Sequence, residues 1–168
     1  MHQLELKYIE YDENTTPREQ HLLEHSVAYS LIETMLEKYF GIISPTILKT
    51  ENGKPYIEKS GVHFSISHTR GLAVCVVADT PVGVDCELIK DKSAANIEKF
   101  AKRFFVENEF LLLEKGGFSS IDFYKVWTAK EATIKKRGSN MSELKNIDIT
   151  KENILTSTEN GYIISINI

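Results

Sequence analysis

Three short strand patterns follow one another between residues 62 and 89 with almost no connecting sequence, and they constrain the fold more than any other feature. They are VHFSIS (62–67), GLAVCVVAD (71–79) and PVGVDCELI (81–89). Runs rich in valine and isoleucine that are separated by turn residues are typical of strands. The middle of the chain is therefore expected to form three consecutive strands.

A long helix is expected on each side of these strands. TPRE (16–19) is a strong start signal, since threonine can cap the helix, proline suits its first position and glutamate completes a capping box. This helix is expected to end at Gly41, and the second is expected over 119–138. The spacing in the first helix predicts that one face carries Leu22, Leu23, Ser26, Val27, Ser30, Leu31, Thr34, Met35 and Lys38.

The remaining patterns are shorter. A strand is expected over 4–9, and hairpins are expected around Asn52-Gly53 and Asn160-Gly161. Two further helices are expected over 97–105, capped by Ser93, and in the segment that ends at Gly116-Gly117.

This order of elements predicts an α+β fold rather than a βαβ chain. It suggests two similar lobes related by a pseudo-twofold, each an antiparallel sheet packed with a long helix. The expected N-terminal lobe is 1–78 and the expected C-terminal lobe is 79–168. A chain of 168 residues can form one such unit with a shared core.

Composition limits the partners. The net charge of −4 and a pI near 5.8 argue against binding to nucleic acid. No apolar run reaches the roughly 18 residues that a membrane span needs, and the N-terminus lacks the pattern of a signal peptide. We therefore expect a cytoplasmic protein, in which Cys75 and Cys86 are buried thiols.

Two carboxylates stand close together in GVDCE (83–87). Side chains two positions apart on a strand share a face, so Asp85 and Glu87 project together. They repel each other unless a cation lies between them. Their neighbours in sequence are mostly apolar, which argues against an ordinary solvated acidic edge.

WTAKEATIK (127–135) can complete this site. In a helix Trp127, Glu131 and Lys135 form one stripe, and three carboxylates converge if Glu131 faces the strand. Oxygen-only ligands suit Mg²⁺, which completes its shell with substrate phosphates, and Lys135 could hold such a phosphate. The alternative is a solvated strand end beside an unrelated charged helix.

Two polar turns add candidate ligand contacts. In FSISHT (64–69), Ser67 and His68 stand at a strand end, where hydroxyls and an imidazole can receive phosphate oxygens. In NGKP (52–55), Lys54 and Pro55 could frame a flat base. Each turn also fits a purely structural role.

Together these motifs resemble the 4′-phosphopantetheinyl transferases, and the larger, surfactin-synthetase-activating type most. The matching segments are GKP (53–55), FSISHT (64–69), GVDCE (83–87), RFF followed by Glu109, and WTAKEATIK (127–135). The resemblance implies two lobes with coenzyme A and Mg²⁺ in the cleft between them. It also implies an enzyme that moves the phosphopantetheine arm of coenzyme A to a serine of an apo carrier protein and releases 3′,5′-ADP.

The resemblance implies specific roles. Asp85, Glu87 and Glu131 would be the metal ligands, and Glu131 would accept the serine proton directly or through a water. Lys135 and His68 would hold coenzyme A phosphates, and the GKP turn would lie against adenine. Trp127 would position the helix, and Lys130 would orient groups or contact phosphate.

The sequence departs from the larger type in its shortness and in its first third. No lysine or arginine lies between Glu19 and Lys38, so Arg18, His21 and His25 are the available residues for the 3′-phosphate, and His25 is the best placed of them. This leaves open a non-catalytic relative that binds coenzyme A or a carrier protein. Another Mg²⁺-dependent phosphotransferase is disfavoured, because no glycine-rich phosphate loop is present.

The partner expected for the enzyme is an acyl or peptidyl carrier protein of fatty-acid, polyketide or nonribosomal-peptide synthesis. Carrier proteins of this kind are acidic, so the basic and apolar segment 97–118 is the candidate docking surface. The alternative is an amphipathic helix pair with a solvated basic face. Because the larger type builds its site between its own lobes, a monomer is expected.

Overall fold

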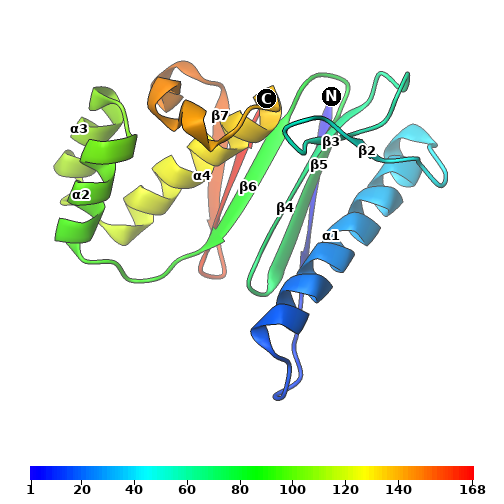
Figure 1. Cartoon of the computed structure of the whole chain (residues 1–168), viewed down its shortest axis with the longest axis horizontal. Helices are drawn as coiled ribbons and strands as arrows, with labels where there is room; N and C mark the ends of the chain where they lie inside the picture. The colour runs from blue at the N-terminus through cyan, green and yellow to red at the C-terminus, as the bar shows by residue number, and fades with distance from the viewer.

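The computed structural model describes all 168 residues and contains two three-stranded antiparallel sheets, each accompanied by a long helix (Figure 1). The first sheet has the order β1-β5-β4, built from β1 (His2–Tyr8), β4 (His63–Thr69) and β5 (Leu72–Ala78). The second has the order β6-β8-β7, built from β6 (Gly83–Leu88), β7 (Ile154–Glu159) and β8 (Tyr162–Asn167). In both sheets the last strand along the chain is the central one. Both sheets are antiparallel and helices accompany them, which confirms the predicted α+β fold with antiparallel sheets.

The helices begin and end where local signals predict. Helix α1 (Pro17–Phe40) has the complete Thr16 and Glu19 capping box and ends at Gly41, whose φ of 67° is left-handed. Helix α4 (Ser120–Arg137) is capped by Ser119 and ends at Gly138. No helix combines the length and the apolar character needed to cross a bilayer.

The shorter elements complete the chain. The expected hairpins are β2 (Leu48–Lys49) with β3 (Pro55–Tyr56), and β7 with β8. Ser93 caps α2 (Ala94–Phe104), which is followed by α3 (Glu107–Lys115), and these two helices stand at the end of the molecule opposite α1 (Figure 1). Two 3₁₀ helices, Met141–Asn146 and Ile149–Lys151, had no sequence prediction.

The predicted buried face of α1 was wrong. The buried residues are Glu24, Ala28, Ile32, Met35 and Leu36, whereas Leu22 and Leu23 are exposed. Apolar residues are spread around this helix, so periodicity alone does not define one face. The small Ala28 lets the helix approach β5, where the Cys75 thiol donates to the Ala28 carbonyl at 3.3 Å.

Strand β5 lies between two apolar layers. Leu72, Val74 and Val76 pack with residues of β6 and β8 from the second sheet. Cys75 and Val77, on the other face, pack with Ile32, Met35 and Leu36 of α1. A strand that is buried on both faces has no solvent side, which explains its unbroken apolar sequence.

The two sheets meet where the edge strands β4 and β6 run side by side. Two serine hydroxyls of β4 bridge them: Ser65 accepts from the Val84 N–H at 3.1 Å and Ser67 accepts from the Cys86 N–H at 3.3 Å. Backbone groups of β6 that would otherwise lack partners are thereby satisfied. The alternation that points Ser65 and Ser67 to one face therefore joins the sheets.

Helix α4 contacts β6 most closely at Gly83. A Cβ atom there would lie 1.9 Å from the Ala132 carbonyl oxygen and 2.4 Å from the Lys136 nitrogen. We therefore expect Gly83→Ala to push helix and strand apart and to lower the free energy of unfolding by about 3 kcal/mol or more. Urea denaturation measures this loss.

Gly61→Ala is the matched control. A Cβ at Gly61 meets nothing within 4 Å, but the φ of 65° is left-handed. This variant should lose only the about 1–2 kcal/mol that a left-handed backbone costs. Equal losses in the two variants would contradict the close packing of α4 against β6.

Candidate functional site

A cavity of about 530 Å³ opens beside the junction of β4 and β6, between the two sheets and their long helices. All nine residues predicted for the site line it: His25, Lys54, Pro55, Ser67, His68, Asp85, Glu87, Glu131 and Lys135. They come from α1, the turn before β3, β3 itself, β4, β6 and α4. Segments far apart in the sequence thus supply one concave polar surface.

The three carboxylates predicted as metal ligands converge in this cavity. Asp85 is 3% exposed, and Glu87 and Glu131 are half-buried. Burial, together with the nearby charges of Asp85 and Glu87, raises the pKa of Glu131 to about 7. Burial and the charge of Asp85 also raise the pKa of Glu87. The cluster therefore holds more negative charge than its surroundings neutralise.

Lys135 provides the only ion pair of this cluster. Its Nζ lies 2.8 Å from Asp85 Oδ1 and 2.9 Å from the Ser67 hydroxyl, which itself donates to Asp85 Oδ1 at 2.8 Å. Burial alone would lower the pKa of Lys135, but the carboxylates of Asp85 and Glu131 outweigh it and raise that pKa. Lys135 therefore stays charged, while the second oxygen of Asp85, Oδ2, is buried without any hydrogen-bond partner.

Trp127 supports Glu87 from α4. The indole of Trp127 and the hydroxyl of Thr69, whose oxygen lies 3.5 Å from Glu87 Oε2, both act to lower the pKa of Glu87 against the larger effect of burial. The indole also packs edge-on against Phe100 and parallel to Phe123, with interplanar angles of 75° and 8°. This contact set agrees with a supporting role for the only tryptophan.

His68 and His25 line the opposite wall of the cavity. His68 Nδ1 lies 3.4 Å from Oε2 of Glu24, a buried residue of α1 that sequence reasoning missed. Burial lowers the pKa of His68, although Glu24 opposes this effect. His25 is exposed and stacks on Tyr29, with ring centroids 4.5 Å apart. The burial of Glu24 could have been suspected, because it lies four and eight residues before the apolar Ala28 and Ile32 on the same helix face.

Comparison with known families shows which superfamily this chain belongs to. Residues 81–166, which contain Asp85, Glu87, Glu131 and Lys135, match the model of the 4′-phosphopantetheinyl transferase superfamily. The chain belongs to this superfamily. The matched segment runs from the start of β6 into β8 and includes all of α4.

Individual members of the superfamily match over longer stretches. The 4′-phosphopantetheinyl transferase HetI of a Nostoc species is 31% identical over an alignment of 150 residues that covers 83% of this chain and 60% of HetI. The transferase gsp of Aneurinibacillus migulanus is 36% identical over 115 residues, 66% of this chain and 46% of gsp. Sfp of Bacillus subtilis strain 168 is 38% identical over 95 residues, 55% of this chain and 41% of Sfp. The chain thus spans about half the length of these relatives.

The carboxylate cluster of this phosphopantetheinyl transferase homologue fits Mg²⁺. All its donors are oxygens, and the buried Asp85 Oδ2 lacks a partner that a cation would supply. Burial first, and then the charge of Asp85, raises the pKa of both Glu87 and Glu131. One lysine cannot balance three carboxylates, so a divalent ion suits the cluster.

Mg²⁺ alone should therefore stabilise the protein. At a concentration 100 times its Kd, one bound ion adds about 2.7 kcal/mol to the free energy of unfolding. For a chain of this size, each kcal/mol raises Tm by about 2–4 °C. Thermal unfolding with and without Mg²⁺ measures the shift. Asp85→Asn should abolish most of it, and an equal shift in that variant would place the ion elsewhere.

The GKP turn of this superfamily member packs on the end of α4. Lys54 Nζ donates to the Lys136 carbonyl at 2.7 Å, and the Asn52 amide donates to the Gly138 carbonyl at 2.9 Å. Burial lowers the pKa of Lys54. The turn is thus fixed at the edge of the cavity with its ammonium group already engaged, and a contact with adenine stays a prediction.

The predicted role of Lys130 was wrong. Its side chain is fully buried, and Nζ lies 2.6 Å from both Glu109 Oε2 and the Ile147 carbonyl oxygen. Lys130 directly precedes Glu131 on the helix, and adjacent helical residues point in different directions, so Lys130 does not face the cavity. It links α4 to α3 and cannot contact a phosphate in the cleft.

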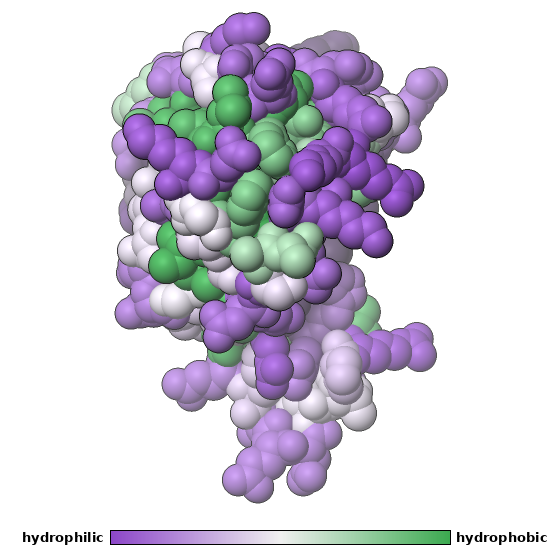
Figure 2. Space-filling model, turned by 90° about the vertical axis from the view of Figure 1, so that its left-hand side faces the viewer, coloured by the Kyte–Doolittle hydropathy of each residue, from purple (hydrophilic) through white to green (hydrophobic).

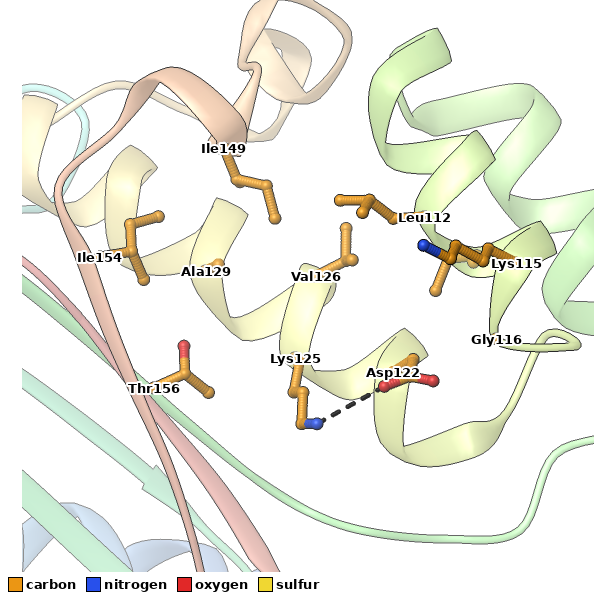
Figure 3. Close-up of a pocket in the computed structure, with 11 residues that line it drawn as sticks. Leu112, Lys115, Gly116, Asp122, Lys125, Val126, Ala129, Ile149, Ile154 and Thr156 are labelled. Carbon is orange, nitrogen blue, oxygen red and sulfur yellow. Dashed lines mark hydrogen bonds and ion pairs between the residues drawn. The ribbon is translucent and has the colours of Figure 1, made fainter.

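A second cavity of about 480 Å³ lies between α3, α4 and β7 (Figure 3). Its walls are mostly apolar, with Leu112, Val126 and Ile149 pointing into it, and Lys125 at its rim pairs with Asp122 at 3.5 Å. None of the nine predicted site residues lines this cavity. The first cavity is therefore the candidate active site of this superfamily member.

Proposed function

We propose that this chain is a 4′-phosphopantetheinyl transferase, which moves the phosphopantetheine arm of coenzyme A to a serine hydroxyl of an apo carrier protein and releases 3′,5′-ADP. The observation that carries the proposal is the convergence of Asp85, Glu87 and Glu131 with Lys135 in one cavity of a chain from this superfamily. Three of its relatives carry the name of this transferase.

Asp85, Glu87 and Glu131 would hold Mg²⁺. When bound, the ion would supply neutralising charge for the diphosphate of coenzyme A. In the reaction, the serine oxygen forms a bond to the β-phosphorus while the bond from that phosphorus to the bridging oxygen breaks. Glu131 would accept the serine proton, directly or through a water.

The cationic and polar residues around the carboxylates would bind coenzyme A. Lys135 stays charged and lies one helical turn from Glu131, so it is placed to orient a phosphate oxygen while held by Asp85 and Ser67. His68 and Ser67 would contact phosphate from β4, and His25 would contact the 3′-phosphate from α1. Lys54 and Pro55 would lie against adenine.

The surface formed by α2 and α3 would receive the carrier protein. Leu111 and Leu112 are each 50% exposed there, beside the exposed Lys102 and Arg103. Figure 2 shows hydrophobic residues interrupted by hydrophilic ones on this side of the molecule. Exposed leucines beside basic side chains suit an acidic partner that also buries apolar surface.

The proposal also covers the division of the chain into lobes, its oligomeric state and its location. Residues 1–78 and 79–168 would be two lobes related by a pseudo-twofold, an arrangement that the repeated strand order of the two sheets supports. The chain would act as a cytoplasmic monomer, with the site between its own lobes.

Release of 3′,5′-ADP tests the function. The chain is incubated with coenzyme A, Mg²⁺ and an apo carrier protein, and the nucleotide is separated by chromatography. We expect release that requires both the carrier protein and Mg²⁺ and that stops when a chelator is added. Coenzyme A binding without any release would instead support the non-catalytic relative, which the scarcity of basic residues on α1 favours.

A further inference from the structure

Two histidines and a buried glutamate meet between α1 and the end of β4, outside the three-carboxylate cluster. His21 and Glu24 lie three residues apart on α1 and so share a face, and His68 approaches them from β4. A ligand-type atom of each residue lies within 4.8 Å of those of the other two. The rings of His21 and His68 have centroids 5.1 Å apart.

Glu24 is a buried carboxyl group without a strong cationic partner. It is 6% exposed, and its only ion-pair contact is with the His68 imidazole. A carboxylate removed from water is costly unless it is paired or coordinates a metal ion. All the other buried residues of α1 are apolar, so the burial of Glu24 requires a specific explanation.

The Glu24 carboxylate is oriented by a short chain of hydrogen bonds. The Tyr11 hydroxyl donates to Glu24 Oε1 and accepts from the Gly71 N–H at 2.7 Å. This leaves Oε2 directed at His68. Hydrogen bonds from neighbouring residues to a metal-binding side chain fix the orientation of that side chain in proteins.

The spacing between Glu24 and His68 suits a shared metal ion better than a hydrogen bond. The distance from Glu24 Oε2 to His68 Nδ1 is 3.4 Å, which is longer than a good hydrogen bond. Two ligands bound tetrahedrally at about 2.0–2.1 Å from one zinc ion lie about 3.3–3.4 Å apart. His21 is exposed at the helix surface, so its side chain is free to rotate toward the same point.

We propose that His21, Glu24 and His68 form a second metal site, which binds a divalent transition-metal ion of the zinc type through two imidazole nitrogens and one carboxylate oxygen. Such a donor set selects zinc over Mg²⁺, which prefers oxygen ligands. The fourth position of the ion is open to water or to an anionic oxygen. Because His68 also lines the large cavity, this site adjoins the carboxylate cluster, but the proposal does not depend on transferase activity.

Titration with Co²⁺, which reports tetrahedral coordination by its visible absorption, tests the site on the full chain. Excess Mg²⁺ is present to occupy the carboxylate cluster. We expect one Co²⁺ per chain with a tetrahedral spectrum, displaced by one equivalent of Zn²⁺. His21→Ala, at an exposed helix position where the fold should survive, should weaken binding by about 10–100-fold or more.

Two further variants make the test specific. His63→Ala removes a histidine from the same strand as His68 and should leave Co²⁺ binding unchanged. Glu131→Gln changes the carboxylate cluster and should also leave it unchanged. The proposal is overturned if no saturable one-to-one binding is found, if His21→Ala binds as tightly as the unmodified chain, or if Glu131→Gln abolishes binding.

Discussion

Glu131→Gln and Asp85→Asn should each reduce phosphopantetheine transfer by about a thousandfold or more. Each change removes one of three converging carboxylates, and charge neutralisation by a metal ion is worth several kcal/mol in the transition state. Asp85 is the most buried of the three and also holds Lys135 at 2.8 Å. Glu131→Gln would additionally remove the proposed acceptor of the serine proton.

Rates of transfer to one apo carrier protein, at saturating coenzyme A and Mg²⁺, measure this loss. Glu33→Gln, an exposed glutamate on α1, is the matched control and should retain full activity. In the presence of a chelator, Glu131→Gln should be at least as stable as the unmodified chain, because it removes repulsion from the cluster. Activity within about tenfold of the unmodified chain in both cluster variants would refute the assigned metal ligands.

Lys130→Met should lower the free energy of unfolding by about 3–5 kcal/mol. Lys130 and Glu109 are both fully buried, with Nζ and Oε2 2.6 Å apart. Removing the lysine leaves a buried carboxylate without its cation. Glu109 cannot turn away, because it also accepts from the N–H groups of Val106 and Ile149 at 3.1 and 3.0 Å.

Two comparisons separate burial from charge. The double variant Lys130→Met with Glu109→Gln should recover most of the loss, because the amide oxygen still accepts from the backbone and no charge stays buried. Lys102→Met breaks the exposed pair with Glu98 and should cost less than about 1 kcal/mol. Urea denaturation that shows similar small losses for Lys130→Met and Lys102→Met would contradict the structural role of the buried pair.

Much of the fold is encoded locally and could be predicted. The capping box at Thr16 and Glu19, the cap at Ser119 and the left-handed Gly41 and Gly138 each act within one helical turn, so they define helix ends without tertiary contacts. The packed face of α1 could not be predicted in this way. It depends on β5, whose two apolar faces are shared between α1 and the second sheet.

The same division applies to the site. The alternation of GVDCE predicts that Asp85 and Glu87 lie together, and helical spacing predicts the stripe of Glu131 and Lys135. Contacts that cross between the sheets could not be foreseen. The Ser67 hydroxyl donates to Asp85 and accepts from Lys135 because the edge strands β4 and β6 lie side by side. Lys130, next to Glu131 in sequence, shows that adjacency on a helix does not place two residues in one site.

Mass spectrometry of the carrier protein tests the central claim most directly. The chain by itself, with coenzyme A and Mg²⁺, is incubated with several apo carrier proteins, and the longer relative Sfp of Bacillus subtilis is used in parallel. We predict that this chain adds the mass of one phosphopantetheine group to a carrier, at the serine that peptide mapping identifies. Carriers that gain this mass with Sfp but never with this chain would contradict the account.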